Sequence, residues 1–270
     1  MPTGRRGNVL LGVAAGVAAA LLIGFVLLPV LAIFLRVSPG RLVSALHSRV
    51  ARDALGVSVK TSLIAVALIL VVGTPTAYVL ATTNLRGRGL ILSLLELPLV
   101  LPPAVAGIGL FAAFGRFGLL GGVLRAVGVQ IPFTQVAVVM ALAFVASPFY
   151  VRQAYAAFAA VDPELLGAAR TLGAGPGGAF WRVGVPVARP GLSAGAALAW
   201  ARALGEFGAT LMFAGSFQGI TQTAPLAIYD EFATNFTGAL SLSAVLVIVS
   251  GALLLTVKLA ASRAHARPFI

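Results

Sequence analysis

The chain has 270 residues, of which 60% are hydrophobic and only 10% are charged. An ordinary soluble domain carries roughly 25% charged residues, so this composition excludes a typical soluble fold and favours the lipid bilayer as the solvent. The net charge of +12 then indicates basic loops beside anionic lipid rather than nucleic-acid binding, because no Lys/Arg cluster is interleaved with aromatic residues.

Six apolar stretches follow one another along the chain, each long enough to cross about 30 Å of hydrocarbon. They must be helices, because lipid offers no partner to an open backbone group. The first lacks charge over 27 residues, whereas a signal peptide has an apolar core of about 7–15 residues. We therefore predict a retained first helix and an all-α, polytopic membrane protein, a single transmembrane domain over residues 1–270, with spans at 9–35, 61–81, 91–114, 135–158, 190–217 and 240–259.

Prolines and glycines interrupt some of these spans. Pro98, Pro102 and Pro103 cannot all sit in one regular helix without freeing carbonyl groups, which predicts a break in the third span. Two G-x-x-x-G patterns, residues 12–16 and 191–195, allow close helix contact. They are typical of packing within one bundle or, alternatively, of a seam between two copies of the chain.

The basic residues indicate the orientation. With the N-terminus in the cytoplasm, the inside segments hold 11 Lys and Arg and the outside segments 7, which agrees with the positive-inside rule. Arg5 and Arg6 then anchor the first span on the cytoplasmic side, and the C-terminus is cytoplasmic too. The loop between the first two spans is unusually basic for an outer loop, and its length predicts a short amphipathic segment at the outer surface.

The polar segment 162–186 between the fourth and fifth spans predicts a short cytoplasmic helix. Asp162 can cap it, with Pro163 at the first helical position and Glu164 in the first turn. Leu165, Ala168, Ala169 and Leu172 recur at helical spacing and form an apolar face, and Gly173 and Gly175 would end the helix. Such a helix either lies on the lipid surface or inserts into a groove of a partner protein.

This segment resembles the E-A-A-x-x-x-G-x9-I-x-L-P signature of ABC importer permeases. Spacing is kept through Gly167-Ala168-Ala169, Gly173 and Val183-Gly184-Val185-Pro186. The resemblance implies a coupling helix that docks on a cytoplasmic ABC ATPase dimer, with coupling residues Glu164, Gly167, Ala168, Ala169, Gly173, Val183 and Pro186. One position departs from the signature: Gly167 stands where the family has glutamate, and Glu164 lies one turn earlier.

A second segment resembles oxyanion importers. The stretch from Arg202 through Gly205-Glu206-Phe207-Gly208 is similar to R-x-L-G-E-F-G-A of molybdate/tungstate and sulfate permeases, and residues 221–229 look more like the molybdate branch. The resemblance implies ATP-driven import of molybdate or tungstate by alternating access. A second permease copy, a periplasmic or extracellular substrate-binding protein facing residues 215–235, and membrane lipid are the implied partners. Asp230 and Glu231 either pair with that binding protein or are solvated loop charges.

Arg202 and Glu206 stand four residues apart inside the predicted fifth span. Ionisable residues at membrane depth are candidates for function. The pair either holds this helix against its neighbours or, together with Thr210, lines the anion pathway or its gate. The stretch 173–178 fits G-x-G-x-x-G but lacks the strand and helix of a dinucleotide site.

Several other functions find little support in the residues. The absence of cysteine, the two isolated histidines and the lack of a phosphate-binding loop argue against catalysis, metal binding and a cofactor on this chain. ATP and Mg²⁺ would be bound by the partner ATPase. An ion-driven carrier would need several membrane carboxylates, and a membrane enzyme would need clustered His, Asp or Glu. Sulfate or another anion remains the alternative cargo.

Overall fold

The computed structural model describes residues 3–265, with side-chain surroundings described for residues 12–252, 255 and 256, and the elements of this part of the chain are all helices. This confirms the all-α prediction. In chain order the helices are α1 (Thr3–Arg36), α2 (Pro39–His47), α3 (Arg49–Thr82), α4 (Arg88–Val100), α5 (Pro103–Phe114), α6 (Gly121–Ala126), α7 (Gln135–Ala159), α8 (Pro163–Thr171), α9 (Pro176–Ala179), the π-helical turn η1 (Phe180–Gly184), α10 (Val185–Leu204), α11 (Gly208–Ala214), α12 (Ala224–Thr234) and α13 (Phe236–His265).

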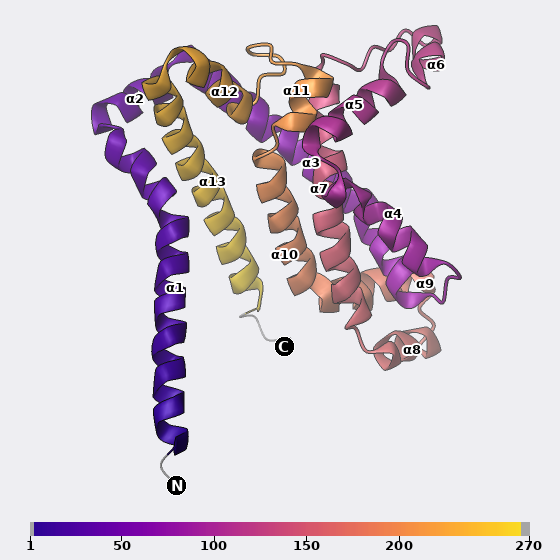
Figure 1. The fold of residues 1–270 in the computed structure, drawn as a ribbon. Coiled ribbons are helices and arrows are strands. Elements are labelled where there is room, and N and C mark those ends of the chain that lie inside the picture. The colour runs from indigo at the N-terminus through magenta and orange to yellow at the C-terminus, as the bar shows by residue number, and fades with distance from the viewer. Residues whose placement is uncertain (1–2, 266–270) are drawn as a thin grey trace.

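Helix α7 is the centre of the molecule, with α3 and α10 packed along it (Figure 1). Small residues make this packing tight: a Cβ at Gly191 of α10 would overlap the Cβ of Ala157, and one at Gly195 would lie 3.0 Å from the Cβ of Gln153. The predicted close contact at 191–195 is therefore confirmed as packing within one chain. Around this core, large apolar side chains stay exposed, for example Phe25 at 77% and Val71 at 73%, as expected for surfaces that face lipid.

Helix α1 stands apart from this core and contacts the rest of the chain mainly through α13 (Figure 1). Nothing lies within 4 Å of a Cβ built at Gly12 or Gly16. Packing of the 12–16 pattern within one bundle is thus wrong for the described part of this chain. The seam between two copies stays a prediction for that pattern.

The spans differ from their predicted bounds in instructive ways. Three described helices, α1 from Gly12, α3 and α7, are long and apolar enough to cross a membrane. Helices α4 and α5 pass the same test together but bend by 112° at their junction, which confirms the proline break expected in the third span. Helices α10 and α13 occupy the remaining two predicted spans.

Two spans were placed wrongly at their ends. The second begins at Arg49 rather than 61, because Ser48 caps the helix by accepting a 3.1 Å hydrogen bond from the Ala51 amide and a buried face continues through its charged first turns. The fifth begins at Val185 rather than 190 and ends at Leu204 rather than 217. Gly205 closes it, and the chain restarts as α11.

The two ends of the bundle carry different structures. Helices α8 and α9 lie at one end, together with the first turn of α1 and the last turn of α13, while α2, α6, α11 and α12 lie at the other (Figure 1). Helix α2 is the short segment predicted between the first two spans. Helix α12 corrects the expectation of a loop over 215–235. Its N-terminus is capped by a residue far away in the sequence, since the Ser58 hydroxyl of α3 accepts a 2.7 Å hydrogen bond from the Ala224 amide.

Candidate functional site

Helix α8 forms as its sequence predicts. The Asp162 carboxylate accepts a 2.9 Å hydrogen bond from the Glu164 amide, with Pro163 in the first turn. At the other end Gly173 takes a left-handed φ of 86°. This conformation lets the Gly173 amide donate to the Arg170 carbonyl and the Ala174 amide donate to the Ala169 carbonyl, at 3.0 Å each. These two hydrogen bonds are the pair that defines a Schellman cap.

The surface of α8 is divided between an anchored and an open side. Leu166 is only 6% exposed and ties the helix to the core, with Ala169 partly buried beside it. On the open side Leu165 is 47% exposed and Leu172 88%, and Ala168 is exposed between them. The predicted apolar face therefore exists, but it is mostly uncovered, and Leu166 is the anchor that the prediction missed.

The remaining residues predicted to act in coupling occupy different positions. Glu164 is exposed beside the cap, and a Cβ at Gly167 would meet nothing within 4 Å. Val183 and Pro186 are half-buried in η1 and the first turn of α10, so they belong to the support of α8 rather than to its open side.

An aromatic cluster supplies much of that support. The Tyr78 ring lies 4.8 Å from Phe180 and 5.3 Å from Phe158, in edge-on arrangements. Gly184 lies against the same tyrosine, because a Cβ there would be 3.0 Å from the ring. The cluster joins η1, at the end of the segment 162–186, to Tyr78 of α3 and Phe158 of α7.

The break between α10 and α11 holds a buried ion pair. Glu206 lies in the break, not in a helix, and its side chain is 1% exposed. Its Oε2 atom is 2.6 Å from a guanidinium nitrogen of Arg202, whose side chain is 27% exposed. Its Oε1 atom accepts a 2.8 Å hydrogen bond from the Ala209 amide. The carboxylate therefore neutralises Arg202 and caps the start of α11 at once.

The third pathway candidate differs from this pair. Thr210 is fully buried, and its hydroxyl is one of three buried side-chain atoms in the described residues without a hydrogen-bond partner. It does not contact open space in this conformation. The structure thus brings Arg202 and Glu206 together, while the role of all three residues in a pathway stays a prediction.

Helix α11 is packed directly onto α5. A Cβ at Gly107 would lie 2.6 Å from the carbonyl oxygen of Ala209 and 2.7 Å from the Cβ of Met212. The backbone of α5 at Gly107 therefore packs directly against α11. Sequence patterns gave no sign of this contact. Nor did they reveal the ion pair between Glu96 and Arg152 of α7, 3.8 Å apart, or the 3.0 Å hydrogen bond from the Trp200 indole to Ser62.

The outer segment 215–235 is held by internal hydrogen bonds and by contacts with α3 and α13. Asp230 accepts hydrogen bonds from Ser216 at 2.7 Å and Gln222 at 2.8 Å, so its carboxylate holds the segment together. Asp230 is nevertheless exposed, and both bonds end on its Oδ2 atom. Its pairing with a binding protein stays a prediction. Glu231 is partly exposed on the adjacent position of α12.

Comparison with known proteins identifies relatives of this chain. Residues 69–264 match the family described as binding-protein-dependent transport system inner membrane component. The chain is 45% identical over 235 residues to the molybdenum transport system permease protein ModB of Mycobacterium tuberculosis, covering 86% of this chain and 88% of that protein. It is 36% identical over 242 residues to the sulfate transport system permease protein CysW of Synechocystis, covering 88% and 87%.

A solved structure shares the fold. A bacterial ABC transporter involved in the import of alginate matches with a TM-score of 0.71 at 16% sequence identity, covering 96% of each chain. At this identity the likeness shows the fold alone, and it agrees with the predicted permease architecture.

Proposed function

Because the chain belongs to the binding-protein-dependent transport system inner membrane component family, we propose that it is the transmembrane subunit of an ATP-driven molybdate importer. The observation that carries the proposal is the helix α8, which is anchored by Leu166 and leaves Leu165 and Leu172 uncovered at one end of a membrane bundle. The cargo follows from 45% identity to a molybdenum permease over most of both chains, against 36% to a sulfate permease.

The open side of α8 fits a groove of a cytoplasmic ATPase. Burying an apolar side chain contributes about 1.5–3 kcal/mol, so Leu165 and Leu172 supply a hydrophobic contact while the small residue Ala168 lets a partner approach closely. The first turn of α1 and the last turn of α13 lie at the same end of the molecule as α8 (Figure 1), so an ATPase docked on α8 implies that these two helix ends are cytoplasmic. ATP and Mg²⁺ bind to that partner, which performs the hydrolysis.

The transport step is alternating access. A binding protein delivers molybdate at the end that carries α2, α11 and α12, and two copies of this chain enclose the path. ATP binding draws the two α8 helices together, and the aromatic cluster around Tyr78 passes the movement to α3 and α7. The break at Gly205 lets α10 move relative to α11, and the chain acts as a two-state passage. The Glu206 carboxylate keeps Arg202 from holding an anion too strongly to release it.

The test is transport by the reconstituted complex. The chain is purified with its ATPase, placed in proteoliposomes with the binding protein, and supplied with molybdate, tungstate or sulfate. ATP-dependent accumulation of molybdate or tungstate in preference to sulfate supports the proposal. Accumulation without the ATPase would refute the importer, and preference for sulfate would refute the cargo. Replacing Arg202 by Ala tests its role, since normal uptake by an intact complex would exclude it from the pathway.

A further inference from the structure

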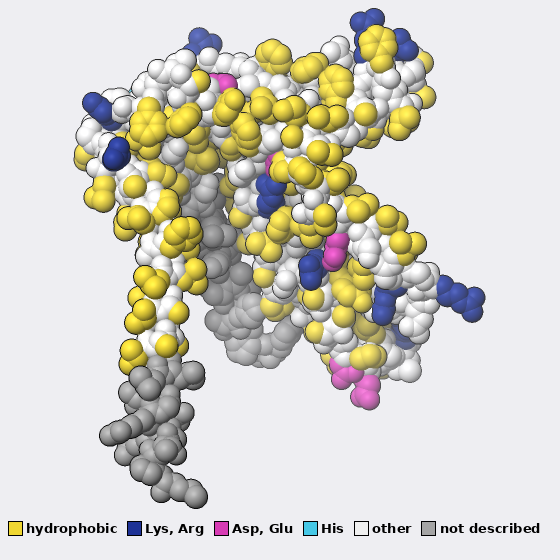
Figure 2. All heavy atoms as spheres, viewed as in Figure 1, with side chains coloured by type: hydrophobic (Ala, Val, Ile, Leu, Met, Phe, Trp, Pro, Cys, Tyr) yellow, Lys and Arg dark blue, Asp and Glu magenta, His cyan; other side chains and the backbone are white. Residues whose placement is uncertain are grey.

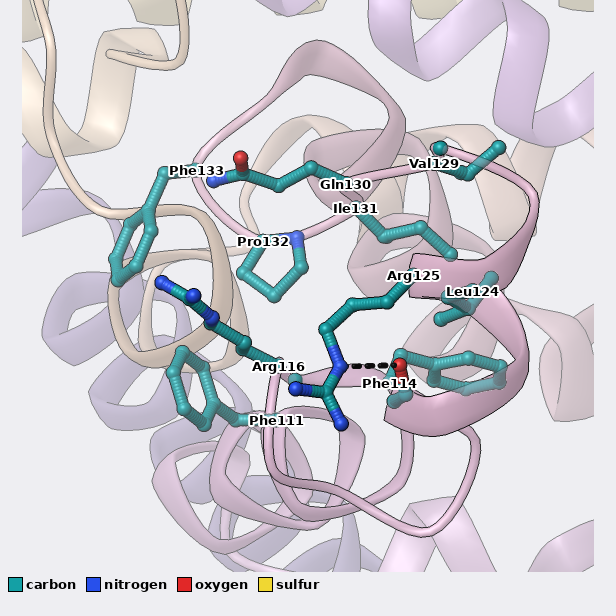
Figure 3. Close-up of a pocket in the computed structure, with 13 residues that line it drawn as sticks. Phe111, Phe114, Arg116, Leu124, Arg125, Val129, Gln130, Ile131, Pro132 and Phe133 are labelled. Atoms are coloured by element: carbon teal, nitrogen blue, oxygen red, sulfur yellow. Dashed lines mark hydrogen bonds between the residues drawn. The ribbon is translucent and has the colours of Figure 1, made fainter.

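A cavity of about 420 Å³ opens at the end of the molecule opposite α8. It lies between the last turn of α5, helix α6 and the segment 127–133 (Figure 3). Phe111, Phe114 and Phe133 provide much of its apolar wall, and Arg116, Arg125 and Gln130 provide its polar groups. None of these residues takes part in the coupling or ion-pair arrangements described above.

The charge of this cavity has one sign. Its lining contains two arginines and no acidic residue, and neither arginine forms an ion pair within the described residues. Arg125 uses Nε to donate a 3.3 Å hydrogen bond to the Gly121 carbonyl, which orients its guanidinium in the cavity (Figure 3). A guanidinium has five N–H donors, so most of the donors of Arg125 remain open to an anion.

The surface beside the cavity is strongly apolar. Phe117 and Leu119 are each 89% exposed, Val127 66% and Val123 65%. Figure 2 shows the same corner, with Lys/Arg side chains directly beside hydrophobic ones. Basic side chains next to fully exposed apolar ones are typical of segments that lie in the headgroup region of a bilayer. An aqueous surface would not expose such a patch without a partner.

We propose that this cavity binds the headgroup of an anionic phospholipid. Arg116 and Arg125 contact the phosphate, Gln130 donates to a headgroup oxygen, and the acyl chains follow Phe117 and Leu119. A free oxyanion would satisfy the arginines but leave the apolar surface uncovered. The lipid covers both, and it fixes the junction of α5 and α6 at the membrane surface. None of the cavity residues belongs to α8 or to the Arg202–Glu206 ion pair, and the proposal does not depend on the identity of the cargo.

Native mass spectrometry of the detergent-purified transporter, titrated with phosphatidylglycerol or phosphatidylcholine, tests the proposal. Each basic side chain near anionic lipid contributes about a fivefold gain in affinity. The double variant Arg116→Gln/Arg125→Gln should therefore bind phosphatidylglycerol about thirtyfold more weakly at the tightest site. Phosphatidylcholine binding should change little. The matched control Arg41→Gln/Arg52→Gln removes the same charge from the same end of the molecule and should leave the tightest site intact.

Three results would overturn the proposal. Equal phosphatidylglycerol binding by the cavity variant and its control would show that the arginines are not the headgroup site. Displacement of phosphatidylglycerol by molybdate would make the cavity an oxyanion site, and displacement by the purified binding protein would make it a protein interface. The chain has no cysteine, so Leu119→Cys offers a fourth check: efficient disulfide cross-linking between two copies would place a second copy on this surface instead.

Discussion

The ion pair between Arg202 and Glu206 predicts an unequal response to removal of its two partners. In Arg202→Met the Glu206 carboxylate, only 1% exposed, is left without its cation. Removing one partner of a buried pair costs about 3–5 kcal/mol. In Glu206→Gln the unpaired guanidinium is 27% exposed and partly hydrated, so the cost is that of a lost charged hydrogen bond, about 1.5–3 kcal/mol.

The double variant should be far more stable than these two costs added together. A matched neutral pair is often close to neutral for stability, and the glutamine can still accept from the Ala209 amide. We expect the double variant to lie within about 1 kcal/mol of the parent. The lower ends of the two single-variant costs are about 3 and about 1.5 kcal/mol. Subtracting the cost of the double variant from their sum leaves a coupling free energy of about 3.5 kcal/mol. Unfolding free energies from SDS titration in mixed micelles measure all three variants. Additive effects, or a larger loss in Glu206→Gln than in Arg202→Met, would refute this account of the site.

Three further predictions concern packing, a long-range cap and docking. Gly191→Val forces its side chain into Ala157 and should lower the free energy of unfolding by about 1–3 kcal/mol, measured by the same titration. Ser58→Ala leaves the buried Ala224 amide without its acceptor and should cost about 1 kcal/mol, with proteolysis near residue 224 increasing. Leu172→Asp places a charge on the open side of α8 without touching the core, so ATPase co-purification and ATP-driven uptake should fall at least tenfold while the thermal midpoint stays unchanged.

Each of these variants has a matched control. Gly56→Val makes the same change at a helix position where a Cβ would have no neighbour within 4 Å. An equal loss of unfolding free energy there would show that helix propensity rather than steric overlap is responsible. Ser44→Ala removes an exposed hydroxyl that donates only to the Gly40 carbonyl and should be neutral. Ile220→Asp adds a charge at the opposite end, where residue 220 is 54% exposed, and should leave ATPase co-purification intact. Loss of co-purification in both aspartate variants would contradict a docking role specific to α8.

The sequence predicted best those features that depend on neighbouring residues. The helix over 135–159 and the helix after Asp162 were located within one or two residues, because Thr134 and Asp162 cap them through local hydrogen bonds. The break at Pro102 follows from proline chemistry alone. Local signals were also available for α12, where Pro225 follows Thr223 at a helix start, and for the end of α10 at Gly205.

Other features depend on contacts between distant segments and could not be read from the chain. The charged residues Arg49, Arg52 and Lys60 lowered the hydropathy of a segment that is nevertheless the amphipathic beginning of α3. The four-residue spacing of Arg202 and Glu206 was predicted to lie on one helix, whereas the pair bridges the end of one helix and the turn before the next. No sequence pattern connects Ser58 to Ala224, or Phe111 and Phe133 to a shared cavity.

The contact between α5 and α11 restricts how these helices can vary during evolution. A side chain at position 107 would press on the carbonyl of Ala209 and on Met212, and close-packed interiors do not absorb an added methyl group without displacement of their neighbours. Helices α5 and α11 must therefore change together during evolution at this contact. In an alignment of relatives, a residue larger than glycine at position 107 should coincide with a smaller residue at position 212 or a shifted break near position 205. Independent variation at these positions would show that α5 and α11 can separate freely in other members of the family.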